Sequence, residues 1–181
     1  MKDFHKELSI LRSLKQSQAK NINMVQDAFP FYSSLWIVTD FCSGGSVRTL
    51  MRSCPSHRLD ERFIVAIARE LIIGLQSVHK QGIVHRDLKA ANVLISETGG
   101  VQLADFGVSA NLEPSTGSKR TTILGTPSWM APEMYKDETE YGVEVDIWGF
   151  GATVYEMANG KAPNEGLPYM QMRQVDRKSV V

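Results

Sequence analysis

The sequence predicts an α+β fold in which a small part with two strands precedes a larger, mainly helical part. Two β-rich runs, 22–29 and 35–41, lie near the N-terminus and are separated by a loop at 30–34. A long amphipathic pattern follows at 61–80, and the run 145–159 is apolar around most of its circumference. A small β-containing part followed by a mainly helical part predicts the α+β class.

The smaller part, residues 1–42, begins with a helical pattern. Between residues 4 and 15, apolar side chains recur at helical spacing, and Glu7 lies on the same expected helix. The two β-rich runs come next, and the segment Ser43-Gly44-Gly45 then breaks the pattern. Such a break indicates a hinge, and a short helix is expected directly after it at 46–52.

The larger part, residues 43–172, has its longest helix at 61–80. Asp60 is a plausible N-cap for this helix, because a short polar side chain before the first apolar position can bond the free backbone N–H groups. One apolar stripe runs along the helix, which indicates a single buried face. Gly82 lies just past the last periodic position and is expected to end the helix.

Short strands are expected at 93–96 and 101–104, on either side of a turn. The polar stretch 105–133 is typical of a loop. The helix expected at 145–159 is apolar on all sides, which predicts that it is buried. The tail 173–181 matches none of these patterns.

Composition narrows the class of protein. The chain has 181 residues, with 20 Lys and Arg against 20 Asp and Glu, so no basic field favours nucleic acid or an anionic membrane as the main partner. Two cysteines, Cys42 and Cys54, do not make a disulfide framework, and a reducing compartment is the simpler interpretation. No apolar run is long enough for a membrane span, and no secretory signal is seen. The expected location is the cytoplasm.

Three motifs carry the chemistry. They are His85-Arg86-Asp87-Leu88-Lys89-Ala90-Ala91-Asn92, Asp105-Phe106-Gly107 and Ala131-Pro132-Glu133, in this order. Together they supply an acidic proton acceptor, a Lys that can face phosphate, and oxygen ligands for Mg²⁺. With these motifs, the chain resembles a eukaryotic protein kinase from about residue 4 to about residue 172.

The resemblance implies roles for four of these residues, with ATP and Mg²⁺ as cofactors. Asp87 would accept the proton of the substrate hydroxyl and orient it for attack. Lys89 would neutralise charge on the phosphoryl group in transfer. Asn92 and Asp105 would hold Mg²⁺ between the β- and γ-phosphates. Any one of these residues taken alone is as well explained by a surface turn or a salt bridge.

The resemblance also places a nucleotide pocket at the hinge. Thr39 would guard the back of the adenine pocket, and backbone groups of Asp40 and Cys42 would bond adenine. Leu94 would pack beneath the ring, and Ser46 would reach the ribose. Such strand and linker residues are structural in most proteins, so these roles follow from the resemblance alone.

Two further groups are expected to organise the fold. Leu11, Val25, His85 and Phe106 would stack into an apolar column between the two parts, although ordinary core packing explains them equally well. Asp146 would bond the backbone near His85, which is a structural task.

Substrate class follows from Lys89 and Thr126. In the family that the chain resembles, a Lys two places after the catalytic Asp accompanies Ser/Thr specificity. Thr126 lies in the stretch expected to receive the substrate, 125–133, and its hydroxyl is expected to bond Asp87 and Lys89; the alternative is a helix-capping Thr before Pro127. The finer resemblance is to the sterile-twenty or germinal-centre-kinase group. Expected partners are proteins with Ser or Thr acceptors and kinases upstream or downstream.

Regulation is expected in the loop after Asp105. Thr122 is the hypothetical activating phosphorylation site, and its phosphate would pair with Arg86. Thr121 is a rival acceptor. Thr126 and Glu7 complete the expected regulatory set.

The pattern departs from the family at one essential feature. No Gly-X-Gly-X-X-Gly occurs in the chain, and Val65-Ala66-Ile67 imitates the strand with the nucleotide Lys but is followed by Ala68. Glu7 matches the Glu that would pair with that Lys. Two hypotheses therefore stand: an incomplete Ser/Thr kinase, expected to be poorly stable and weakly active, or a catalytically deficient fragment that acts as a binding or regulatory module.

Overall fold

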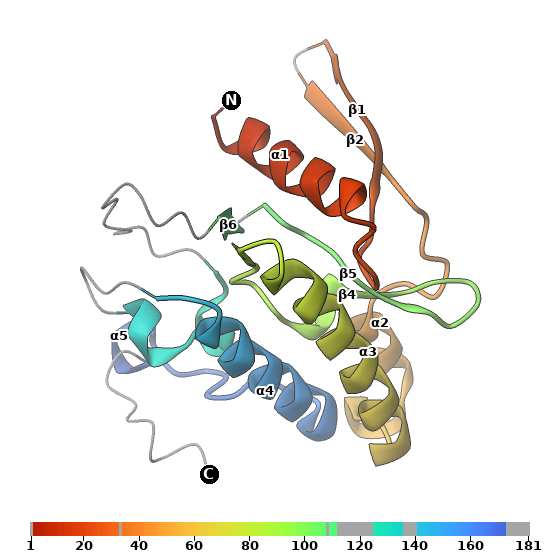
Figure 1. Cartoon of the computed structure of the whole chain (residues 1–181). Coiled ribbons are helices and arrows are strands. Elements are labelled where there is room, and N and C mark those ends of the chain that lie inside the picture. Colours follow the sequence, from red (N-terminus) through yellow and green to blue (C-terminus); the bar gives the residue numbers. More distant parts are fainter. Residues whose placement is uncertain (1, 33, 108, 112–124, 136–140, 173–181) are drawn as a thin grey trace.

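The computed structural model describes residues 2–32, 34–107, 109–111, 125–135 and 141–172 (Figure 1). Its α-helices are α1 (Lys2–Gln16), α2 (Val47–Ser53), α3 (Glu61–His79), α4 (Glu144–Asn159) and α5 (Tyr169–Met172). Its strands are β1 (Val25–Phe31), β2 (Ser34–Thr39), β3 (Ile83–Val84), β4 (Val93–Ile95), β5 (Val101–Leu103) and β6 (Ala110–Asn111). Four short 3-10 turns are η1 (Pro55–His57), η2 (Ala90–Asn92), η3 (Pro127–Trp129) and η4 (Pro132–Tyr135). This order confirms the predicted α+β class.

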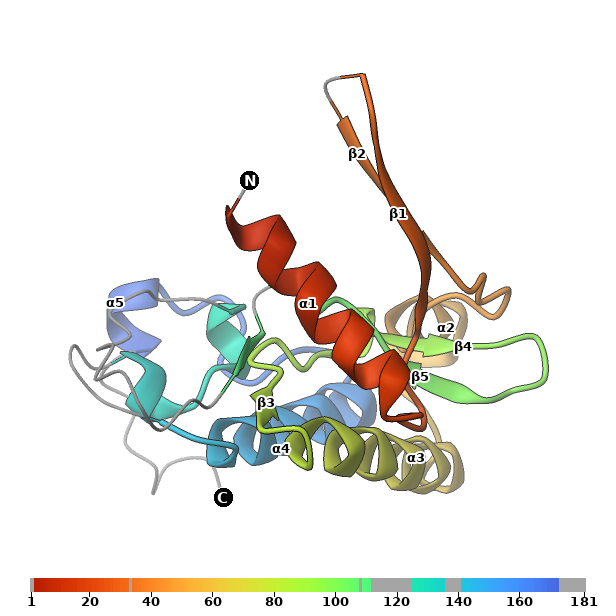
Figure 2. The same cartoon turned by 45° about the horizontal axis from the view of Figure 1, so that its top comes forward.

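The described strands form three antiparallel pairs: β1 with β2, β3 with β6, and β4 with β5. The β1–β2 ribbon extends away from the helices (Figure 2). Its aromatic side chains are largely in water, with Phe31 50% and Trp36 53% exposed. An isolated ribbon of this kind is marginally stable, because only one partner strand completes its hydrogen bonds.

The first predicted strand is shifted in the structure. The sequence predicted a strand at 22–29 and a loop from residue 30, but β1 begins at Val25 and continues to Phe31. Ile22 instead forms an isolated parallel bridge with Leu103, which ties this segment to β5. The β-rich pattern therefore predicted the right region for this strand, but pairing with other strands of the chain decided where it begins and ends.

The long helix α3 follows its predicted range closely and buries the expected face, with Ile67, Leu71 and Leu75 in the core. The predicted N-cap is wrong in one respect. Asp60 occupies the cap position, but its side chain makes no capping hydrogen bond and lies 3.6 Å from Arg62 in an exposed ion pair. Its carboxylate is 72% exposed, so water can satisfy the first N–H groups of α3.

The main core lies between α1, α3, the β4–β5 pair and one face of α4. Its fully buried members include Leu14, Leu71, Leu103, Phe106 and Met157. A second cluster joins β3, the 125–135 segment and the start of α4. Figure 2 shows α3 and α4 side by side beneath α1, and the loop that links β3 to β4 lies over their contact.

The prediction that residues 145–159 form a helix buried on all sides is wrong. One face of α4 is buried, but on the other face Ile147 is 59% and Tyr155 41% exposed. Trp148 and Phe150 are half-buried against the two clusters. Within the described residues, α3 and the loops cover one side of α4 only, so apolar periodicity overstated its burial.

In the described part of the chain, none of the helices combines the length and apolar character that crossing a bilayer requires.

Candidate active site

The segment 85–92, called the catalytic loop below, starts where β3 ends. Arg86 has a left-handed backbone, with φ of 71°, which a residue with a side chain adopts only when its surroundings hold it there. The Asp146 carboxylate supplies that hold, because it accepts the N–H of His85 at 2.8 Å and of Arg86 at 2.7 Å. His79 Nε2 lies 2.8 Å from the same carboxylate. The predicted structural role of Asp146 is thereby confirmed.

Four predicted site residues meet around Asp87. Lys89 Nζ donates to Asp87 Oδ2 and to Thr126 Oγ1, both at 2.7 Å. The Thr126 hydroxyl donates to Asp87 Oδ1 at 2.6 Å. Asn92 Nδ2 completes the group, with 3.0 Å to Asp87 Oδ2 and 2.9 Å to the Asp87 carbonyl. Both oxygens of one carboxylate are therefore held by three neighbouring side chains.

The contacts predicted for Thr126 are present, and the alternative for this residue is wrong. Thr126 does stand at the N-cap position of η3, but its side chain makes no capping hydrogen bond. The hydroxyl faces Asp87 and Lys89 instead, across 39 and 37 positions of sequence. A charge-assisted hydrogen bond is stronger than one to a neutral backbone N–H, which explains the preference.

The cluster keeps Asp87 ionised. Burial raises the pKa of this carboxyl, but the hydrogen bonds from Lys89, Thr126 and Asn92 outweigh burial, and the net pKa lies below its ordinary value. An ionised carboxylate with a lowered pKa is a weak base. Its main capacity is to accept a hydrogen bond from a hydroxyl and so to orient that hydroxyl.

His85 is the neutral neighbour of this cluster. Burial lowers its pKa, against the opposing charges of Asp146, Asp87 and Asp105. Because the Ala104 carbonyl can only accept, the 3.0 Å contact assigns the ring proton to Nε2, and Nδ1 then accepts the Asp87 N–H at 3.3 Å. The imidazole thus links the catalytic loop to the segment before Asp105.

Asp105 is joined to the cluster through the backbone. The Ala104 N–H donates to the Asn92 carbonyl at 2.9 Å, and the Ala104 carbonyl accepts from His85. Asp105 itself has a left-handed φ of 65° and an exposed side chain, with Gly107 N–H 3.4 Å from Oδ1. This backbone is sparsely populated, and such conformations gather at functional sites.

The donor chemistry near Asn92 and Asp105 fits Mg²⁺. Asn92 uses its Nδ2 on Asp87, which leaves the amide oxygen as its free ligand atom, and the Asp105 carboxylate is exposed. Mg²⁺ prefers such oxygens, and it commonly takes one or two from protein and the rest from phosphates and water. The described residues contain no group of three or more His, Cys, Asp and Glu that could hold a metal by themselves.

The four residues predicted to form an apolar column are all in the interior. Leu11, Val25, His85 and Phe106 are all buried, at 4%, 9%, 0% and 1% exposure. The rings of His85 and Phe106 meet edge to face with centroids 4.9 Å apart. Leu11 on α1, Val25 on β1 and Phe106 belong to one buried cluster, and His85 meets that cluster through Phe106.

The predicted nucleotide residues lie around the end of β2 and the start of α2. Thr39 ends β2 and is exposed. The Asp40 carbonyl accepts Asn23 Nδ2 at 3.0 Å, and the Cys42 carbonyl accepts the Gly45 N–H at 2.9 Å. These bonds hold the hinge in one conformation.

Ser46 and Leu94 meet through an isolated antiparallel bridge. The Ser46 hydroxyl accepts the Thr49 N–H at 3.1 Å and caps α2. This capping role is structural, and the ribose contact expected of Ser46 stays a prediction.

Sequence reasoning missed Asn23, whose side chain donates a hydrogen bond to the hinge backbone at Asp40. Asn23 is 5% exposed, and its Nδ2 reaches Gln102 Oε1 at 2.9 Å and Cys42 Sγ at 3.5 Å as well as the Asp40 carbonyl. Burial raises the pKa of the Cys42 thiol, which keeps it protonated. The available signal was a lone amide between the apolar residues Ile22 and Val25.

Glu156 was missed as well, and it joins three elements. Its carboxylate is 1% exposed and accepts Arg48 Nη1 at 3.0 Å, the Ala90 N–H at 2.9 Å and Trp129 Nε1 at 2.9 Å. These donors come from α2, the catalytic loop and η3. The signal was a single acid within the apolar half of the 145–159 pattern.

The predicted regulatory residues are only partly described. Arg86 donates through Nη1 to the Tyr141 hydroxyl at 3.2 Å, and its buried Nε has no hydrogen-bond partner among the described residues. Thr122 and its rival Thr121 lie outside the described residues. Glu7 lies on α1, but its side chain is likewise outside the described set.

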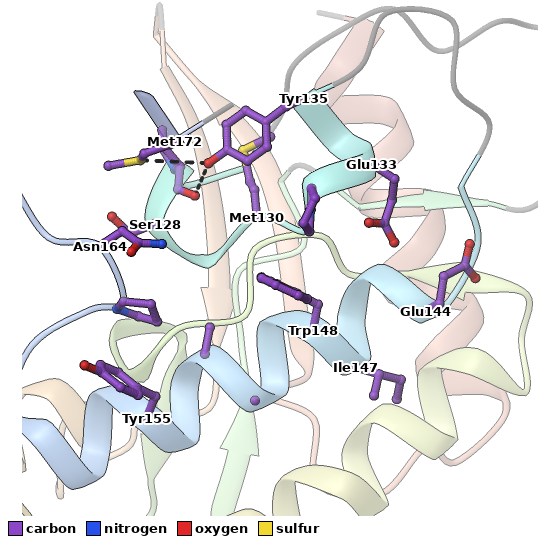
Figure 3. Close-up of a pocket in the computed structure, with 15 residues that line it drawn as sticks. Ser128, Met130, Glu133, Tyr135, Glu144, Ile147, Trp148, Tyr155, Asn164 and Met172 are labelled. Atoms are coloured by element: carbon purple, nitrogen blue, oxygen red, sulfur yellow. Dashed lines mark hydrogen bonds between the residues drawn. The ribbon is translucent and has the colours of Figure 1, made fainter. Parts of the chain in front are cut away.

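A cavity of about 690 Å³ lies between η3, η4 and α4. Figure 3 shows Trp148 rising from α4 toward the segment that carries Met130, with Tyr135 and Met172 beyond it. The Tyr135 hydroxyl donates to the Pro127 carbonyl and lies 3.9 Å from Met172 Sδ. Asp87, Lys89, Asn92 and Asp105 do not line this apolar cavity, so it is separate from the Asp87 cluster.

Comparison with known proteins identifies the family. The family model described as "Protein kinase domain" matches residues 1–180. The chain is 43% identical over 175 residues to the serine/threonine-protein kinase KIC1 of Saccharomyces cerevisiae, which covers 95% of this chain and 16% of KIC1. It is 40% identical over 160 residues to STE20 of Kluyveromyces lactis, covering 87% of this chain and 16% of STE20. It is 42% identical over 171 residues to sid1 of Schizosaccharomyces pombe, covering 94% of this chain and 35% of sid1.

The chain therefore spans between about a sixth and a third of the length of these relatives. Relatives of the STE20 type confirm the resemblance to the sterile-twenty group. The match along nearly the whole chain, the order of the three motifs and the closed cluster around Asp87 lead to one conclusion: the chain belongs to the family of serine/threonine protein kinases.

Proposed function

We propose that this chain transfers the γ-phosphoryl group of ATP to Ser or Thr hydroxyls of protein substrates. The observation that supports this proposal best is the triangle of Asp87, Lys89 and Thr126, with all three sides between 2.6 and 2.7 Å. It places an ionised acceptor and a cation within one hydrogen bond of each other. Phosphoryl transfer needs little more from protein than position and charge.

In the proposed reaction, the substrate hydroxyl oxygen forms a bond to the γ-phosphorus as the bond from that phosphorus to the β,γ-bridging oxygen breaks. The hydroxyl proton passes to Asp87 and the bond electrons leave with ADP. Lys89 counters charge on the transferring group, since its ammonium already lies at the carboxylate. When bound, Mg²⁺ would neutralise phosphate charge, with Asn92 and Asp105 as its protein ligands.

The nucleotide would lie along the hinge. Asp40 and Cys42 are the proposed backbone partners of adenine, with Thr39 behind the ring and Leu94 beneath it. The fixed hinge conformation supports this, because preorganised donors and acceptors lose less entropy on binding. The division into a smaller part at 1–42 and a larger part at 43–172 is proposed on the same basis. Protein partners, other kinases among them, and a cytoplasmic location stay predictions.

The test is phosphate transfer from labelled ATP with Mg²⁺ to matched peptides that carry Ser, Thr or Tyr as the acceptor. We expect label on Ser and Thr, and we expect Asp87→Asn to reduce transfer by about 10²-fold or more, because the amide cannot take the proton. Asp60→Asn is the matched control, since its carboxylate is exposed and away from the cluster. Transfer that survives unchanged in Asp87→Asn would refute the assigned mechanism.

A second candidate is a catalytically deficient binding or regulatory module. The exposed aromatic side chains of the β1–β2 ribbon, Phe31 and Trp36, favour it, because such surfaces commonly bind other proteins. Wild type and Asp87→Asn would then be equally inactive with every peptide. In that case both forms should capture a partner kinase equally well, and Trp36→Ser should weaken the capture.

A further inference from the structure

A second cavity, of about 340 Å³, opens beside α2. It is lined by Arg48, Met51, Arg52, His57, Glu156 and Gly160. Three of these residues come from α2, one from η1 and two from the end of α4 or directly after it. The lining combines an apolar floor with several cationic groups at its edge.

The charge of this cavity is positive. Between residues 41 and 59 the chain contains three Arg and one His but no Asp or Glu, although the whole chain has no net charge. The only carboxylate in the lining is Glu156, and Arg48, Ala90 and Trp129 already donate to it. Glu156 thus neutralises Arg48. Among the lining residues, Arg52 and His57 have no second acid beside them.

The backbone around the cavity is held in place. Gly160 ends α4 in the left-handed region, with φ of 78°, and a Cβ there would lie 2.8 Å from the Ser56 carbonyl oxygen and 3.0 Å from that of His57. This close approach seats η1 on the end of α4. The backbone of His57, at the edge of the cavity, is consequently packed against the end of α4.

The cavity is also connected to the catalytic loop. Glu156 Oε2, at its inner wall, accepts the N–H of Ala90, the residue after Lys89. The same oxygen accepts Trp129 Nε1 from η3, three residues after Thr126. An extended peptide advances about 3.3 Å per residue, so a few residues would be enough to extend from a hydroxyl at Asp87 to a site beside Glu156.

We propose that this cavity is a specificity subsite that binds an anionic side chain of the peptide substrate close to the acceptor hydroxyl. The chemistry shared by Asp, Glu and a phosphorylated residue is a group of negatively charged oxygens, which Arg52, His57 and the outer nitrogens of Arg48 can bond. The inference rests on the proposed function, because it supplies the substrate class for the same active site.

The test measures binding of fluorescein-labelled peptides by anisotropy, so that it does not depend on turnover. A neutral reference peptide has one Ser acceptor, and a set of peptides places one Asp at each position around it. A second set carries phosphoserine, which separates the two sources of anion. We expect the best anionic peptide to bind about five- to tenfold tighter than the reference, since Arg52 and His57 are exposed to screening water.

Variants locate the effect. Arg52→Gln and His57→Gln should each reduce the preference, and Arg52→Glu should transfer it to a peptide with Lys at the same position. Arg62→Gln, an exposed cation on α3 outside the cavity, is the matched control and should keep the preference. Circular dichroism verifies that each variant is folded.

The outcomes divide cleanly. A preference for the anion that falls in Arg52→Gln and reverses in Arg52→Glu supports the subsite. Equal affinity for anionic and neutral peptides, no binding of any anionic peptide, or a preference that Arg52→Gln leaves intact overturns it. The proposed function is tested by a different measurement, phosphate transfer that depends on Asp87. Its failure can therefore be distinguished from failure of the subsite.

Discussion

Replacing Glu156 should lower the free energy of unfolding, by an amount that depends on the residue that takes its place. In Glu156→Ala, the fully buried Ala90 N–H and the Trp129 indole N–H lose their acceptor, at about 1–3 kcal/mol each. Arg48 adds at most about 1 kcal/mol, because its side chain is 42% exposed and water can replace the carboxylate. The expected loss in the free energy of unfolding is about 3–5 kcal/mol.

Glu156→Gln should be much milder. Ala90 and Trp129 share one carboxylate oxygen, Oε2, whereas Arg48 uses Oε1. An amide oxygen at the Oε2 position can therefore keep two of the three bonds, and only the ion pair with Arg48 is lost. We expect a cost of about 1 kcal/mol, so the two variants should differ by about 2–4 kcal/mol.

Urea unfolding followed by circular dichroism measures these differences, with Glu97→Gln on the exposed 97–100 turn as the control within about 0.5 kcal/mol. In thermal unfolding, a loss of about 3 kcal/mol corresponds to roughly 6–12 °C. A cycle of Arg48→Met, Glu156→Gln and the double variant isolates the ion pair. If Glu156→Ala cost no more than Glu156→Gln, the bridging role of this carboxylate would be refuted.

Three further predictions follow from single contacts. Because burial lowers the pKa of His85, the unfolded chain binds a proton at this residue more readily than the folded chain below about pH 6.5. The free energy of unfolding should therefore fall with decreasing pH in that range, by up to about 1.4 kcal/mol per pH unit. Urea titrations should show that the variant His85→Gln loses this pH dependence, whereas His57→Gln, at an exposed position, keeps it. Thr126→Val should reduce phosphate transfer at least about tenfold while Thr126→Ser retains most of it, since only the hydroxyl bonds Asp87 and Lys89; equal rates in single-turnover assays would contradict this. Gly160→Ala should lower the melting temperature, because its Cβ meets the Ser56 carbonyl, whereas Gly151→Ala, with open space at its Cβ, should raise it slightly.

Local patterns were sufficient for helices α1 to α4 and for the chemistry of the loop. The amphipathic period of residues 61–79 predicted α3, because one buried face needs only side chains within the same helix to alternate correctly. The five-residue spacing from Asp87 to Asn92 likewise brought two site residues together within one loop. Periodicity was misleading for α4, where apolar side chains at Ile147 and Tyr155 are exposed, because a residue's type does not say which neighbour covers it.

The sequence by itself determined the residue types of the proposed phosphoryl-transfer site, their order and the family to which the chain belongs. Only the tertiary structure decided that Asn23 bonds Gln102 and that Glu156 ties α2 to the catalytic loop. These contacts join residues 66 to 108 positions apart. Hydrogen bonds between such distant groups depend on the packing of whole helices and on strained loop conformations, and no local pattern of side chains encodes either.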